Sequence, residues 1–128
     1  MKIILGLLAV PILIFSFPVF AKSPDCTDSG AWPASMAYAE LKNAEIIDSD
    51  TLDFEKTRVV RLASERIGKD PIFHKGLYRQ VHRVTFVKKS GETLAVITVN
   101  DASHQECSMS DVDVYVVSKR LGLSQEKK

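Results

Sequence analysis

The sequence has little of the material from which most recognisable functional motifs are built. It contains only two cysteines, six glycines and one tryptophan in 128 residues. No glycine-rich loop of the kind that binds phosphate groups or dinucleotides is present. The cysteines have no third and fourth ligand at the spacing of a zinc site. These absences exclude the nucleotide-binding and zinc-binding classes that such motifs define, and we expect no cofactor and no metal.

The chain also lacks a surplus of charge of either sign. Its 17 Lys and Arg residues nearly balance its 16 Asp and Glu residues, which leaves a net charge of +1. A polybasic nucleic-acid binder carries a clear excess of positive charge, so no nucleic acid is expected as a partner. The charged fraction of 26% together with 45% hydrophobic residues also excludes a wholly disordered chain.

One long apolar run lies at the N-terminus. Residues 3–20 follow Lys2 without a charged side chain, and Ala21 precedes Lys22. A positive start, an apolar stretch and a small residue before the cleavage point are typical of a secretory signal peptide. We therefore predict that the signal peptide, residues 1–21, is removed after Ala21.

The alternative is an uncleaved anchor, because about 18 apolar residues can just span a bilayer. Pro11 and Pro18 within the run argue against that alternative. Cleavage leaves residues 22–128 as a single small domain, and this length allows hardly a second one. The expected location is periplasmic or secreted, with no stable membrane anchor after cleavage.

Export makes a disulfide between Cys26 and Cys107 the expected state of the two cysteines. Two free thiols or a shared metal are the alternatives, and neither has support in the spacing. The bond would close a loop of about 80 residues, for which the chain-entropy model gives about 4.5 kcal/mol of stabilisation. We predict a structural staple, since redox sites more often use a Cys-x-x-Cys motif.

The mature chain has the pattern of one helix followed by strands. Pro33, followed by apolar residues at helical spacing, predicts a helix over residues 33–44. A turn signal at residues 89–92 between two β-branched runs predicts a hairpin. Residues 57–67 favour a strand, with a helix as the alternative. The remaining expected elements are strands over residues 77–88, 93–99 and 112–117, a polar loop over residues 100–110 and a frayed tail over residues 121–128.

These elements define an α+β fold, in which an N-terminal helix packs on an antiparallel meander sheet of three or four strands held by one disulfide. Along residues 77–88, strand alternation places Arg79 and Arg83 on one face and a more apolar set on the other. We expect the apolar set to face the helix and the two arginines to face outward. The apolar set consists of Tyr78, Gln80, His82, Val84 and Phe86.

Charge is unevenly placed although its total almost vanishes. Residues 22–55 carry two basic and eight acidic side chains, whereas residues 56–89 carry ten basic and two acidic ones. A positive surface attracts an anionic partner and accelerates the encounter. If residues 57–67 pair with the next strand, their arginines widen that surface. The alternative is that the acidic residues 45–55 lie against the basic strands and neutralise them within the fold.

Few residues have the pattern of a catalytic or metal site. His82 or His104 can act as a base, but no nucleophile elbow of the Gly-x-Ser-x-Gly kind accompanies them. The acidic and histidine residues at 101–106 match no closed set of metal ligands. Residues 48–53 lack the ligand and the glycine that a calcium loop has at its fifth and sixth positions. An enzyme is therefore the less favoured class.

We expect instead a small exported protein-binding module, in its most concrete form an immunity protein or inhibitor that neutralises a toxin or hydrolase. Arginine suits such a role because it pairs with carboxylates through two hydrogen bonds. Trp32 is a candidate hot spot, with packing over the disulfide as the alternative. Two further alternatives are a small envelope hydrolase that uses His82 or His104, and a binder of anionic polymer or lipid headgroups. The expected contact residues are Arg79, Arg83, Arg58, Arg61, Lys88, Trp32, Asp48 and Asp50.

Overall fold

The computed structural model describes residues 22–117. The predicted signal peptide and the predicted tail at 121–128 lie outside the described residues. None of the helices in the described part has the length and apolar character needed to cross a membrane. The elements are α1 (Trp32–Asn43), two short 3₁₀ turns (Ser49–Thr51 and Phe54–Lys56), β1 (Arg58–Lys69), β2 (Gly76–Val87), β3 (Thr93–Ala102) and β4 (Asp113–Val116).

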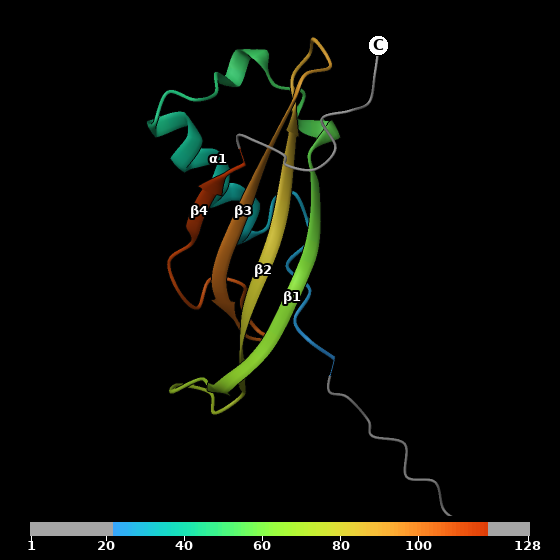
Figure 1. Cartoon of the computed structure of the whole chain (residues 1–128). Coiled ribbons are helices and arrows are strands. Elements are labelled where there is room, and N and C mark those ends of the chain that lie inside the picture. The colour runs from blue at the N-terminus through green and yellow to red at the C-terminus, as the bar shows by residue number, and fades with distance from the viewer. Residues whose placement is uncertain (1–21, 118–128) are drawn as a thin grey trace, which may run out of the picture.

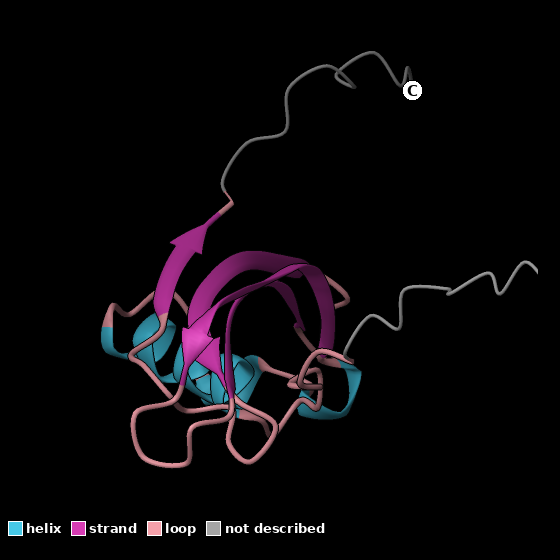
Figure 2. Cartoon of the chain, turned by 90° about the horizontal axis from the view of Figure 1, so that it is seen from below, coloured by secondary structure: helices cyan, strands magenta, loops and turns pink. Residues whose placement is uncertain are grey.

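The strands form one antiparallel sheet in the order β1-β2-β3-β4. Each strand therefore pairs with its neighbour in sequence, as in a meander (Figure 1). The sheet is strongly curved, and α1 lies on its concave side (Figure 2). We call the concave side the inner face and the convex side the outer face. The structure confirms the predicted α+β fold, with four strands and one disulfide.

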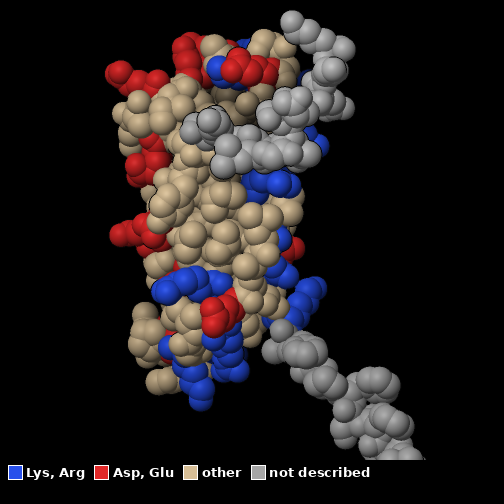
Figure 3. Space-filling model, in the orientation of Figure 1, with Lys and Arg blue, Asp and Glu red and all other residues tan. Residues whose placement is uncertain are grey.

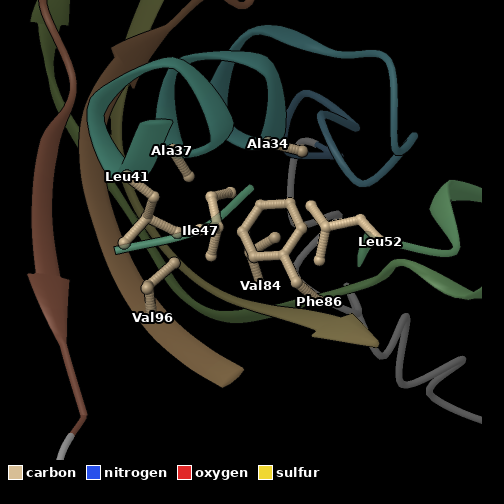
Figure 4. Packing of buried hydrophobic residues seen from close by; sticks show 8 residues of the cluster. All are labelled: Ala34, Ala37, Leu41, Ile47, Leu52, Val84, Phe86 and Val96. Atoms are coloured by element: carbon tan, nitrogen blue, oxygen red, sulfur yellow. The ribbon is translucent and has the colours of Figure 1, made fainter. Parts of the chain in front are cut away.

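The hydrophobic core lies between α1 and the inner face. α1 begins at Trp32 with Pro33 at its first turn, where a missing backbone donor costs nothing. Its buried stripe packs on side chains of β2 and β3, and the loop after the helix closes the top (Figure 4). The core cluster consists of Ala34, Ala37, Leu41, Ile47, Leu52, Val84, Phe86 and Val96.

Two strands end at least two residues later than expected. The strand favoured over residues 57–67 is present as β1 and extends to Lys69. β3 continues to Ala102, three residues beyond the predicted end, so the prediction of a loop from residue 100 was wrong. Asn100 and Asp101 are residue types typical of loops, yet here they pair with Gln80 and Arg79 of β2.

The predicted disulfide between Cys26 and Cys107 is present, with Cα atoms 5.8 Å apart. It joins the segment before α1 to the loop after β3. The segment is also fixed by the Pro24 carbonyl, which accepts hydrogen bonds from Gln80 Nε2 at 2.8 Å and from Arg61 at 3.0 Å. The N-terminal segment is therefore fixed beside Gln80 on the inner face, and the loop after β3 is fixed beside Asn100 through the Cys107 carbonyl.

Candidate functional site

The outer face of the sheet carries one row of side chains from all four strands. Val60 of β1, Arg83 of β2, Ile97 of β3 and Tyr115 of β4 are direct cross-strand partners in that order. Directly opposed residues in an antiparallel ladder share a face, so the four side chains lie side by side. We call them the outer row. Val60 is 45% exposed and Tyr115 is 58% exposed, and Arg83 is also exposed.

Mostly apolar and small residues lie beside the outer row. Ala63, Val81, Val99 and Asp113 form the next row toward the hairpin end, and they are exposed or half-buried. Figure 3 looks onto this face and shows mostly uncharged surface over the middle of the sheet. The middle of the outer face is therefore largely apolar over β1, β2 and β3, with Arg83 near its centre and Asp113 on the edge strand β4.

Arg58 and Arg83 are the two cations on this part of the face. Arg58 pairs with Thr85 and lies two residues before Val60 on β1, so the two side chains lie on the same face. Within residues 22–117, no Asp or Glu lies at ion-pair distance from either guanidinium group. Their hydrogen-bonding capacity toward carboxylates is therefore not used inside the described domain.

Arg79 faces outward as predicted, but it already has an internal partner. Its Nε and Nη2 atoms donate to the two carboxylate oxygens of Asp101 at 3.0 and 3.3 Å. The side-chain hydrogen bond to Asp101 raises the pKa of Arg79 above its usual value. Arg79 is therefore a weaker candidate for contact with a partner than Arg83.

The remaining basic candidates lie elsewhere. Arg61 pairs with His82, so it points to the inner side of the edge strand and donates to the Pro24 carbonyl. A β-bulge between Arg61 and Ala63 shifts the register at this point. The expectation that all arginines of residues 57–67 widen one positive surface is therefore wrong for Arg61. Lys88 forms an ion pair with Glu92 across the β2–β3 turn.

Trp32 and the acidic candidates also lie away from the outer row. The indole of Trp32 donates to the carbonyl of Ser110 at 3.0 Å, which ties the start of α1 to the segment before β4. Asp48 accepts a hydrogen bond from the backbone of Asp50 and so caps a 3₁₀ turn. The predicted contact residues therefore do not form one patch.

Acidic and basic side chains are unevenly distributed along the molecule. In Figure 3 acidic groups are more frequent toward the upper end and the left side, and Lys and Arg are more frequent at the lower end, where the β1–β2 hairpin lies, although each end carries both signs. Among the described residues, the carboxylates of residues 45–55 form a side-chain ion pair only with Lys56, through Asp53. The segment lies against the end of β2, but within the described residues it does not neutralise the arginines of β1 and β2 through direct ion pairs.

Neither candidate base has a catalytic partner among the described residues: His104 is exposed and its Nε2 contacts the Lys22 carbonyl, while its ring packs edge-on against Tyr78. His82 is fully buried, and neither of its ring nitrogens has a hydrogen-bond partner there. Burial lowers the pKa of His82, and the nearby charge of Arg61 lowers it further while Asp25 raises it. Among the described residues, His82 therefore lacks the solvent access and the hydrogen-bond partners that a general base uses.

Sequence reasoning missed several surface residues. Ile97 and Val60 belong to the outer row only because of the strand register, which a single sequence does not fix. Ile72 and Phe73 at the tip of the β1–β2 hairpin are 71% and 56% exposed. The sequence did contain a signal for this tip. Two consecutive large apolar residues lie between the Asp70-Pro71 and Lys75-Gly76 turn signals.

Comparison with known proteins finds no family model, no curated protein and no solved structure that matches this chain. Among residues 22–117, no three His, Cys, Asp or Glu side chains come together as a metal site requires. The functional argument therefore depends on the surfaces described above.

Proposed function

We propose that this chain is an exported protein-binding module that neutralises an enzyme or toxin, and that it binds through the outer face of its sheet. The observation that carries the proposal is the position of Arg83 among apolar neighbours, without an internal carboxylate partner in the described domain. Arginine and tyrosine are enriched among the residues that dominate binding energy, and the outer row contains both.

The chemistry of this face indicates the kind of partner. Its apolar rows suit a surface that becomes dry on binding, while Arg83 near the centre and Arg58 beside it suit pairing with carboxylates of the partner. An enzyme whose cleft presents acidic side chains matches both features. The disulfide and the absence of a membrane-spanning helix in the described part support an extracellular setting for such a partner.

The test is capture of the partner from envelope extracts of the source organism by the purified protein, followed by identification through cross-linking. The double variant Arg58→Glu with Arg83→Glu is expected to lower the affinity for that partner at least about 100-fold. Lys42→Glu, in the exposed last turn of α1, is the matched control and is expected to bind as the unmodified protein does.

The function itself is tested on the identified partner. A saturating amount of this protein is expected to abolish the activity of the partner enzyme. Full activity in the saturated complex, or undiminished capture by the double variant with an unchanged melting temperature, would contradict the proposal.

A further inference from the structure

The tip of the β1–β2 hairpin presents two large apolar side chains to solvent. Ile72 is 71% exposed, the highest fraction among the exposed large hydrophobic residues of the described chain, and Phe73 is 56% exposed. Single exposed apolar residues are common on protein surfaces. It is less common to find two consecutive ones at the end of a long hairpin. This hairpin extends away from α1 (Figure 1).

Hydrogen bonds within the turn fix the backbone conformation of the tip. The carboxylate of Asp70 is fully buried and accepts hydrogen bonds from the backbone N–H groups of Ile72 at 3.1 Å and Phe73 at 2.9 Å. The backbone of Asp70 also bonds to Lys75 and His74 across the turn. His74 adopts a left-handed backbone conformation with φ of 54°. The two apolar side chains are therefore held outward before any binding event, which lowers the entropy lost on binding.

Positive side chains surround this tip. Lys69 ends β1, Lys75 precedes β2, and Arg66 lies three residues before Lys69 on the same strand. All three are exposed, and none forms an ion pair with a carboxylate of the described residues. The one carboxylate within the turn, Asp70, is buried and occupied by backbone donors. The exposed charge at the tip is therefore positive.

The opposite end of the molecule carries side chains of both signs, with acidic groups more frequent there than at the tip (Figure 3). An anionic surface therefore attracts the hairpin end more strongly than the far end, so the charge distribution orients the molecule with its tip toward that surface. Apolar side chains inside a basic collar are the pattern by which peripheral proteins bind anionic bilayers.

We propose that residues 70–75 bind the surface of an anionic lipid bilayer, with Ile72 and Phe73 inserted among the acyl chains and Lys69, Lys75 and Arg66 on the headgroups. A bilayer accepts a small protruding apolar group without a complementary pocket. A standard protein interface instead covers about 800 Å² on each partner, which is more than a two-residue tip offers. This binding goes beyond the proposed function, and it leaves the outer row exposed.

The experiment uses the purified protein in the form that its host exports, with sucrose-loaded vesicles and a sedimentation assay. Vesicles of phosphatidylcholine with about 30% phosphatidylglycerol are compared with pure phosphatidylcholine, since each cation near an anionic surface contributes about a fivefold gain. We expect binding to the anionic vesicles at least about 30-fold tighter, and a loss of this preference in high salt.

The insertion is tested by Ile72→Ser with Phe73→Ser, which is expected to weaken binding to the anionic vesicles by about 30-fold or more. Ile46→Ser is the matched control, because Ile46 is 46% exposed but lies in the acidic segment after α1. That control is expected to bind as the unmodified protein does. Equal binding by the double serine variant means that only surface charge is involved, and it overturns the insertion.

A second readout does not depend on the loss of binding. The chain has one tryptophan, Trp32, at the start of α1. In Phe73→Trp, brominated acyl chains are expected to quench the added emission, whereas the emission of the unmodified protein stays unquenched. Absence of quenching in a variant that binds the vesicles overturns the proposal. So does loss of the captured protein partner upon Ile72→Ser with Phe73→Ser, because the tip then belongs to the protein interface.

Discussion

The two faces of the sheet differ in how far the rest of the described chain buries them. On β2, Val84 points inward and is fully buried under α1, whereas its neighbour Arg83 points outward and is exposed. Strand alternation alone produces this difference, because consecutive side chains point to opposite faces. The comparison teaches that the inner face holds the fold, while the outer face, which we propose as the binding surface, contributes little to the core.

The inner face is itself divided. The part under α1 is apolar, whereas the rest of the inner face contains Gln80, His82, Thr98 and Asn100, all buried. Five polar atoms of these four residues have no hydrogen-bond partner in the described domain. Each such atom opposes folding by about 1–3 kcal/mol when it stays unsatisfied. Gln80 and Asn100 donate to the carbonyls of Pro24 and Cys107 in the two segments that lie against this polar part. The disulfide holds these two segments together.

The largest expected effect on stability follows from removing the disulfide. Cys26→Ser with Cys107→Ser is expected to lower the free energy of unfolding by about 4.5 kcal/mol, because the unfolded chain regains the entropy of a long open loop. Urea unfolding monitored by circular dichroism measures the change. Hydrogen exchange is expected to rise first in residues 22–28. A loss below about 1 kcal/mol would show that the two segments stay in place without the bond.

A smaller effect is expected in the pH dependence of stability, through the buried His82 in the polar part of the inner face. The folded-state pKa of His82 is lowered by burial, so the unfolded chain binds the proton more readily than the folded chain does. Stability is therefore greatest above the unfolded pKa of about 6.5 and decreases as the pH falls below it toward the folded-state pKa.

The measurement is the free energy of unfolding between pH 7.5 and pH 5 for the unmodified protein and for His82→Gln. The variant is expected to lose part of the pH dependence, since glutamine does not titrate in this range. His74→Asn is the control, because His74 is exposed and asparagine tolerates its left-handed backbone. The same slope in all three proteins would refute the role of His82.

The sequence predicts the fold where its pattern has a clear period. The helix and the β2–β3 hairpin were predictable from apolar spacing and from the turn at residues 89–92, and the single possible cysteine pair gave the disulfide. β1 was ambiguous because most of its side chains are exposed on an edge strand, so no alternation marks a buried face. The end of β3 was missed because buried Asn100 has the residue type of a loop.

The candidate site was predictable only in part. Alternation along β2 placed Arg79 and Arg83 on the outer face correctly. It did not reveal that Asp101 pairs with Arg79, since that contact depends on the register between β2 and β3. The bulge next to Arg61 likewise depends on the pairing of two strands, and a single sequence does not specify it.

The division between the two faces is tested most directly on the neighbouring residues Arg83 and Val84. Stability and capture of the protein partner are measured for Arg83→Ala and for Val84→Ala. Val84→Ala is expected to lower the free energy of unfolding by about 2 kcal/mol and to retain capture at temperatures where it is folded. Arg83→Ala is expected to keep its stability within about 0.5 kcal/mol and to lose at least about tenfold in affinity. An Arg83 variant that unfolds easily, or one that binds as well as the unmodified protein, would contradict the account.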